Sequence, residues 1–238
     1  MPRTEVPLTV ERPSSWAKGW GYRLSLRGGT PLYDILKRVL DVLVSVVALI
    51  LFLPLFPFIA LAIVLDSPGP VFFCQERIGK GGRPFCVYKF RSMVANADPT
   101  LHRQYVRRLM AGSSSSSRAD TLFKIDKDPR ITRVGSVLRK TSLDELPQLI
   151  NVLKGEMTLV GPRPDLPYSV REYEPWQRRR LDALPGLTGL WQVSGRSRLS
   201  PREMMELDVR YVNERTLWLD IAILLKTIPC ILWMRDSC

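Results

Sequence analysis

Two adjacent carboxylates, Asp144 and Glu145, are the residues of this sequence best suited to chemistry. Arg139 lies a few residues before them, and carboxylates in a basic setting are expected to stay ionised. An ionised aspartate can act as a nucleophile or hold Mg²⁺. A structural explanation also exists, because Ser142-x-x-Glu145 and Thr141-x-x-Asp144 both match a helix capping box. For the pair taken alone, the structural explanation is the more common one.

Arg163 lies between two prolines in the turn of residues 161–164 and is a candidate for ligand binding. Because each proline ring fixes its own backbone torsion, the guanidinium is presented with little freedom. A planar guanidinium held in this way suits bidentate capture of a phosphate or stacking on a base. An arginine in a merely rigid turn explains the pattern equally well.

Two other basic residues are candidates for contact with phosphate groups. Lys89 extends from a predicted strand, as either a solvated edge residue or a phosphate contact. Arg196 ends a glycine-dense segment, residues 185–196, whose backbone could approach a ligand closely. A plain loop with a core Trp191 is the alternative for that segment. The three arginines at 178–180 are interpreted instead as a solvated or headgroup-facing helix surface.

Composition limits the class of protein. The chain has 238 residues, enough for one catalytic domain and an attached segment, and its 45% hydrophobic content argues against disorder throughout. The net charge of +12 predicts a polyanionic partner, which could be nucleic acid, an anionic membrane surface or a phosphate-bearing substrate.

The four cysteines show no Cys-x-x-Cys spacing, and His102 is the only histidine. This pattern argues against a zinc site and against a disulfide framework, and it favours a reducing compartment. Residues 1–34 are polar, basic and contain prolines, so no secretory signal is expected there.

An apolar run at residues 42–65 holds 24 residues without a charge. A helix of this length can cross the ~30 Å hydrocarbon core of a bilayer. Pro54 and Pro57, however, lie near the middle of the run and would bend the helix. Basic residues flank both ends, and positive charge favours the cytoplasmic side of a membrane. A bent, re-entrant helix satisfies both flanks, whereas a spanning helix satisfies only one.

The remaining sequence predicts an α+β domain that is mainly helical. Residues 71–75 and 85–90 are expected to form a small β-hairpin around a glycine-rich turn. A helix is expected from about residue 142 to 154, ended by Gly155. The apolar tail at 217–234 contains charges and a proline, which is typical of an interfacial amphipathic helix.

Six motifs with their own spacing follow one another along the chain. They are Lys37-Arg38-x-x-Asp41 with Pro54 after it, Tyr88-Lys89-Phe90-Arg91-Ser92-Met93, Arg139-x-x-Ser142-Leu143-Asp144-Glu145-Leu146-Pro147-Gln148, Asn151-Val152-Leu153-Lys154-Gly155-Glu156-Met157 leading into Gly161-Pro162-Arg163-Pro164, Pro185-Gly186-x-Thr188-Gly189, and Gln192-Val193-x-Gly195-Arg196. Together they resemble the bacterial sugar transferases, also called monotopic phosphoglycosyl transferases, over roughly residues 35–235. Each motif is weak alone, but six in register argue against accidental similarity.

The resemblance implies an enzyme on the cytoplasmic face of the bacterial inner membrane. It would transfer a sugar-1-phosphate from a UDP-sugar to polyprenyl (undecaprenyl) phosphate and release UMP, as the priming step of polysaccharide or glycoconjugate synthesis. Inner-membrane lipid is an implied partner, a homodimer is compatible with the family, and no nucleic acid is implied.

The same resemblance implies roles for individual residues. Asp144 matches the family's nucleophile, which would carry the phosphosugar as a covalent aspartyl intermediate. Glu145 matches its partner, which would assist metal binding or deprotonate the polyprenyl phosphate. Mg²⁺ is the implied cofactor, at Asp144 and Glu145. Arg163 falls in the segment associated with uridine binding. The positions that match phosphate contacts are Lys89, Arg139 and Arg196.

Three regions are therefore predicted. Residues 1–33 form a partly flexible lead, residues 34–67 a re-entrant membrane helix-break-helix, and residues 68–238 a cytoplasmic catalytic domain with a C-terminal interfacial helix. Within that domain, residues 95–130 are expected to be irregular, with serines 113–117 in a mobile loop.

The chain departs from the family at Leu53, where relatives often carry a small polar residue before the proline. A serine hydroxyl could satisfy a carbonyl freed by the bend, whereas leucine cannot.

Two other classes of protein compete with the enzyme. In a membrane-anchored nucleic-acid binder, basic residues would be aligned on one stripe, but here they are spread over turns and paired with acids. An inactive membrane-surface scaffold would tolerate Asp144→Asn.

Overall fold

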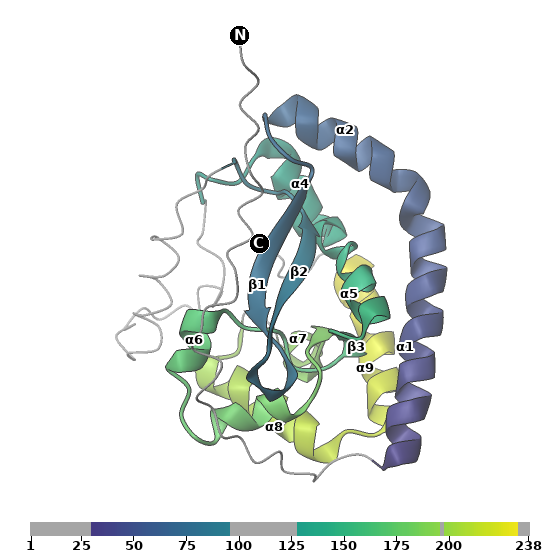
Figure 1. Cartoon of the computed structure of the whole chain (residues 1–238), viewed down its shortest axis with the longest axis vertical. Coiled ribbons are helices and arrows are strands. Elements are labelled where there is room, and N and C mark those ends of the chain that lie inside the picture. The colour runs from purple at the N-terminus through teal and green to yellow at the C-terminus, as the bar shows by residue number, and fades with distance from the viewer. Residues whose placement is uncertain (1–29, 96–127, 196–197, 233–238) are drawn as a thin grey trace.

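The computed structural model describes residues 30–95, 128–195 and 198–232, which form helices around two small sheets (Figure 1). The N-terminal lead up to residue 29 and most of the segment expected to be irregular, including serines 113–117, lie outside the described residues. The helices are α1 (Pro31–Phe52), α2 (Phe56–Asp66), α4 (Arg133–Thr141), α5 (Gln148–Lys154), α6 (Pro167–Arg171), α7 (Leu190–Ser194), α8 (Pro201–Glu214) and α9 (Leu217–Leu232). The strands are β1 (Phe72–Ile78), β2 (Pro84–Phe90), β3 (Thr158–Val160) and β4 (Gly186–Thr188).

A long apolar helix, Pro31–Asp66, runs along one side of the molecule (Figure 1). Its length and composition would allow it to cross a membrane, and most of its apolar side chains are exposed. At Leu53–Leu55 it changes to 3₁₀ geometry, and α1 and α2 meet at an angle there. The break lies at Pro54, as predicted, because proline lacks the N–H that a continuous helix requires.

Polar side chains bind the first half of this helix to the core, among them Arg38 and Asp41. Arg38 donates to the carbonyl oxygens of Val152 and Leu153 at 2.6 and 2.8 Å, at the C-terminus of α5. Asp41 is buried and accepts hydrogen bonds from the Thr158 hydroxyl at 2.5 Å and from the Leu159 N–H at 3.0 Å. These contacts fix α1 against α5 and β3.

The end of α2 is bound to the same body. Arg91 is buried and donates to the carbonyl oxygens of Ser67 and Pro68, each at 2.6 Å, which satisfies groups left free where α2 stops. Asp66 accepts a hydrogen bond from the Val134 N–H of α4 at 2.9 Å. Both ends of the apolar helix pair are therefore attached to one folded unit.

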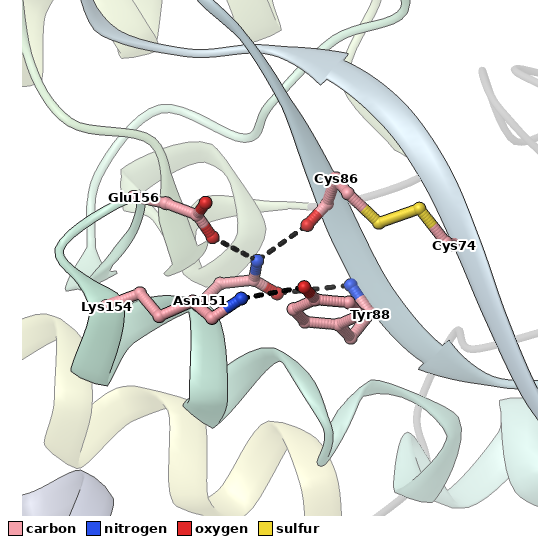
Figure 2. The surroundings of a disulfide bond; sticks show 6 residues. All are labelled: Cys74, Cys86, Tyr88, Asn151, Lys154 and Glu156. Carbon is pink, nitrogen blue, oxygen red and sulfur yellow. Dashed lines mark hydrogen bonds between the residues drawn. A yellow bond between two sulfur atoms is a disulfide. The ribbon is translucent and has the colours of Figure 1, made fainter. Parts of the chain in front are cut away.

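The predicted β-hairpin is confirmed. Strands β1 and β2 pair antiparallel, with Cys74 opposite Tyr88 and Glu76 opposite Cys86. This register brings Cys74 and Cys86 to diagonal positions with a Cα–Cα distance of 5.6 Å, and the structure joins them by a disulfide (Figure 2). The sequence argued against a disulfide framework and did not anticipate this disulfide, because the hairpin register and not the spacing along the chain brings the two cysteines together.

The helix expected over residues 142–154 is interrupted. Helix α4 ends at Thr141, Ser142 adopts a left-handed conformation (φ 59°), and a 3₁₀ turn covers Leu143–Glu145. Helix α5 begins only at Gln148, because Pro147 has no N–H with which to continue a helix from the preceding turn. Gly155 ends α5 in a left-handed conformation, as predicted.

The hydrophobic core lies where β2, α5, β3, α8 and α9 meet. Its buried side chains include Val87, Leu149, Val152, Met157, Leu159, Tyr211, Val212 and Ile223. Helix α9 places Ile223 in this core and leaves Trp218, Leu225 and Ile228 exposed, so the predicted tail helix has one packed face and one apolar exposed face.

Candidate active site

Asp144 and Glu145 lie in the 3₁₀ turn between α4 and α5. The capping-box explanation for this pair is wrong, because the Ser142 side chain makes no capping hydrogen bond. The Thr141 hydroxyl donates to the Val137 carbonyl oxygen at 2.9 Å instead. Neither carboxylate caps a helix, and the functional explanation gains weight accordingly.

Two cations hold Glu145. The Lys89 ammonium from β2 lies 2.9 Å from Oε1, and the Arg163 guanidinium from the turn after β3 lies 2.6 Å from the same oxygen. Burial alone would raise the pKa of Glu145, but Arg163 and Lys89 outweigh burial and hold it well below its usual range. Glu145 is therefore ionised across the physiological range.

Asp144 has a different environment. Its side chain is buried, and within the described part of the chain its carboxylate accepts no hydrogen bond. Burial raises its pKa, and the neighbouring Glu145 adds to the effect, while Lys89, Arg139 and Arg163 act in the opposite direction. The expectation that basic neighbours keep both carboxylates ionised is thus supported for Glu145, whereas the net shift at Asp144 opposes it.

Lys89 is positioned by the packing of β2 on α5. Buried Asn151 of α5 accepts a hydrogen bond from the Tyr88 N–H at 3.1 Å and donates to the Cys86 carbonyl oxygen at 2.6 Å (Figure 2). Its amide also donates to Glu156 at 2.7 Å. Because α5 follows the carboxylate turn directly, this one amide fixes the strand that carries Lys89 relative to the turn.

Arg163 is positioned by close contact of two backbones. A Cβ atom on Gly161 would lie 2.4 Å from the Leu184 carbonyl oxygen, and one on Gly186 would lie 2.1 Å from the Gly161 nitrogen. No side chain fits there, so these glycines allow the parallel pairing of β3 with β4. The glycine-dense segment is therefore not a plain loop, because it contains strand β4. At Gly186 its backbone packs against Gly161 and not against a ligand.

The other predicted contacts have mixed outcomes. Arg139 lies in the last turn of α4, close enough for its charge to lower the pKa of Asp144. Arg196 lies outside the described residues. Trp191 is buried in α7, as the alternative for its segment required. The structure thus brings Lys89, Arg139 and Arg163 together around the carboxylate pair.

The interpretation of residues 178–180 as a solvated surface was wrong for Arg180. Its side chain is only 6% exposed and contacts the buried acids Asp165 and Asp208. No signal in the sequence distinguishes Arg180 from exposed Arg179, because the difference arises from how the 3₁₀ helix Gln177–Asp182 packs on α8.

The carboxylate pair could hold a divalent cation. Among the described residues, no group of three or more Asp, Glu, His or Cys side chains could form a metal cluster. Mg²⁺ commonly takes one or two carboxylates, with waters and substrate phosphates completing the octahedron. Both cations contact Glu145 through Oε1. Asp144 and Glu145 therefore fit an open Mg²⁺ site completed by a phosphate substrate, and they do not fit a site closed by protein alone.

The chain is similar to several bacterial sugar transferases and polysaccharide-synthesis proteins. The chain is 43% identical over 199 residues to the galactosyl transferase CpsE of Streptococcus agalactiae serotype III (strain NEM316), an overlap of 83% of this chain and 42% of that protein. It is 42% identical over 207 residues to the exopolysaccharide production protein ExoY of Rhizobium meliloti (strain 1021), an overlap of 87% of this chain and 90% of that protein. It is 43% identical over 223 residues to the UDP-glucose:undecaprenyl-phosphate glucose-1-phosphate transferase of Caulobacter vibrioides (strain ATCC 19089 / CIP 103742 / CB 15). This overlap covers 88% of this chain and 76% of that protein.

The chain spans less than half the length of CpsE but most of ExoY. A single family model, described as bacterial sugar transferase, matches residues 32–234, a range that includes α1, α2, both strands of the hairpin and the carboxylate turn. With that match extending over nearly all of its length, the chain belongs to the bacterial sugar transferase family.

Proposed function

We propose that this chain transfers a sugar-1-phosphate from a UDP-sugar to polyprenyl phosphate, with release of UMP, in the priming step of polysaccharide or glycoconjugate synthesis. The Caulobacter relative is named for this type of transfer to undecaprenyl phosphate. The observation that carries the proposal is the carboxylate pair, in which buried Asp144 lies beside Glu145, itself held by Lys89 and Arg163. The names of the relatives contain different sugars, galactose in one and glucose in another, so the proposal does not specify the sugar.

In the first step, a carboxylate oxygen of Asp144 attacks the phosphorus that bears the sugar. The bond from that phosphorus to the bridging oxygen breaks, and UMP leaves with this oxygen and its electron pair. The product on the protein is an acyl phosphate between Asp144 and the phosphosugar. Nucleophile and substrate are both anionic, so the charges of Lys89, Arg139 and Arg163 are needed to offset their repulsion.

Mg²⁺, held by Asp144 and Glu145 when bound, would supply Lewis-acid stabilisation of the phosphate oxygens. Lys89 and Arg163 also hold Glu145 in place without the ion, at the distances given above.

In the second step, an oxygen of the polyprenyl phosphate attacks the same phosphorus. The bond to Asp144 breaks, the carboxylate is regenerated, and a polyprenyl diphosphate sugar is formed. Two roles had been left open for Glu145, metal binding and proton removal. A carboxylate with so low a pKa is a weak base, and a phosphate monoester is already largely ionised near pH 7 because its second pKa is about 6. We therefore assign Glu145 to binding cationic groups, namely Lys89, Arg163 and the metal ion, and not to removing a proton.

The lipid acceptor requires the site to lie at a membrane surface, and the apolar helix supports this location. Its two ends are bound to the same folded body, through Arg38 and Asp41 at one end and through Arg91 at the other. A bilayer core about 30 Å thick could separate these ends only if the body itself entered the membrane. A re-entrant helix on the cytoplasmic face agrees with the attachments and with the basic flanks.

This topology predicts that two single-cysteine labels react from the same side. Thr30→Cys precedes α1 and Arg133→Cys begins α4, and both positions are exposed. In a cysteine-free background, neither position should react with a membrane-impermeant maleimide in right-side-out vesicles. Both should react once these vesicles are opened and the cytoplasmic face is exposed. Labelling of the two positions from opposite faces would contradict the re-entrant arrangement and restore a spanning helix.

The proposed reaction predicts that UMP release beyond one equivalent per enzyme depends on polyprenyl phosphate. The measurement uses the full chain in lipid nanodiscs with a panel of UDP-sugars, with UMP and lipid-linked sugar quantified together. We expect one or a few UDP-sugars to give the two products in a 1:1 ratio. A folded chain that releases no UMP with any UDP-sugar, but binds DNA or RNA with steep salt dependence, would point to the nucleic-acid alternative instead.

A further inference from the structure

Arg180 is enclosed within the protein close to the site, although it does not contact the carboxylate pair. Its side chain is 6% exposed. The guanidinium reaches four acceptors from different parts of the chain: Asp165 Oδ2 at 3.4 Å, the Tyr173 hydroxyl, Asp208 Oδ2 at 2.5 Å, and the backbone carbonyl oxygen of Arg163 at 2.8 Å.

The charge of Arg180 is balanced inside the protein. Asp165 and Asp208 are both buried, and Asp165 is fixed in turn by the Leu166 N–H and by the Tyr173 hydroxyl, each at 2.8 Å. Burial raises the pKa of Asp208 to about 6, although Arg180 acts in the opposite direction. A planar guanidinium that is buried and hydrogen-bonded to four acceptors has little freedom to move.

The position of Arg180 fixes the turn that carries Arg163. Four consecutive carbonyl oxygens of the turn each accept a hydrogen bond: Pro162 from the Gly186 N–H (2.8 Å), Arg163 from Arg180 (2.8 Å), Pro164 from the Arg77 guanidinium (3.2 Å), and Asp165 from the Ile78 N–H (2.9 Å). The two prolines add fixed φ angles. Among these four donors, Arg180 is the one that binds the backbone of residue 163 itself.

The opposite end of Arg163 reaches the site. Its Nη2 lies 2.6 Å from Glu145 Oε1, and its side chain is 31% exposed, so it is open to a ligand. Because the guanidinium follows its backbone, a displacement of the turn by about 1 Å would break the hydrogen bond to Glu145, and misplacements of this size can reduce rates by about 100-fold.

We propose that Arg180 is a positioning residue, which holds the backbone of Arg163 so that its guanidinium meets Glu145 and the substrate. This inference rests on the proposed function, in which Arg163 lies at the UDP-sugar. Lysine could not replace Arg180, because one ammonium cannot span acceptors on four sides as a planar guanidinium does.

The test compares Arg180→Lys, Arg163→Ala and the double variant, with Arg179→Lys as the matched control because Arg179 is exposed on the same 3₁₀ helix. We expect Arg180→Lys to reduce kcat/KM by about 10- to 100-fold, divided between kcat and KM as in Arg163→Ala. In the Arg163→Ala background the same change should have no further effect, because the residue that it positions is absent. Arg179→Lys should match the wild type.

Three outcomes would overturn the inference: an unaltered kcat/KM in Arg180→Lys, an equal loss in both backgrounds, or a loss shared by Arg179→Lys. If Arg180→Lys does not fold, as judged by its thermal midpoint, Asp208→Asn takes its place. This variant keeps a side-chain oxygen beside Arg180 but removes the charge that holds it, and the same dependence on Arg163 is expected. Because the wild type must release UMP for any comparison, failure of the proposed function would be seen separately.

Discussion

Asp144→Asn is expected to abolish sugar-phosphate transfer while leaving the protein folded. Asparagine has nearly the same shape but is not a competent nucleophile, so UMP release should fall by roughly 10³-fold or more. The trapped phosphosugar adduct, measured by intact mass after incubation with UDP-sugar alone, should disappear. Glu214→Gln, an exposed change on α8, is the control and should retain both signals.

The same variant should be at least as stable as the wild type. Burial and the Glu145 charge raise the pKa of Asp144, so above that pKa the ionised carboxylate destabilises the folded state relative to the unfolded state. Asparagine removes this penalty at neutral pH, and the thermal midpoint should be unchanged or higher, as is common where a functional residue opposes stability. Turnover retained in Asp144→Asn, or product formed with no protein-linked species, would remove Asp144 from the mechanism.

Asp220→Ala is expected to have the largest effect on stability. Asp220 is fully buried. Its carboxylate accepts hydrogen bonds from the Tyr33 hydroxyl at 2.9 Å, the Lys37 ammonium at 3.0 Å and the Tyr211 hydroxyl at 2.6 Å. Removing it leaves the Lys37 charge, whose side chain is only 12% exposed, without its partner. Breaking a buried ion pair in this way costs about 3–5 kcal/mol, measured as a reduced free energy of unfolding in denaturant.

Two comparisons separate this effect from general damage. Glu214→Ala breaks the exposed pair with Arg210 and should cost no more than about 0.5 kcal/mol. Adding Lys37→Met to Asp220→Ala should restore part of the lost stability, because the stranded charge is then absent. If the double variant is less stable than Asp220→Ala alone, the Lys37 charge is not what Asp220 holds.

Local sequence determined the elements whose signals are local. The apolar run, its break at Pro54, the β-hairpin and the stop at Gly155 depend on residue types within a few positions of one another. Asp144 and Glu145 could also be selected from the sequence, since adjacent carboxylates with an arginine close before them are visible without a fold.

The tertiary structure decided the residues whose neighbours are distant along the chain. Lys89 and Glu145 are 56 residues apart, and Arg163 and Glu145 are 18 apart, so their shared contact requires β2 to pack on α5 and the turn after β3 to fold back. The burial of Arg180 has the same origin, because long-range packing decides whether a cation is solvated or enclosed. The pairing of Cys74 with Cys86 depends on the register of the hairpin, which the spacing of the cysteines along the chain does not reveal.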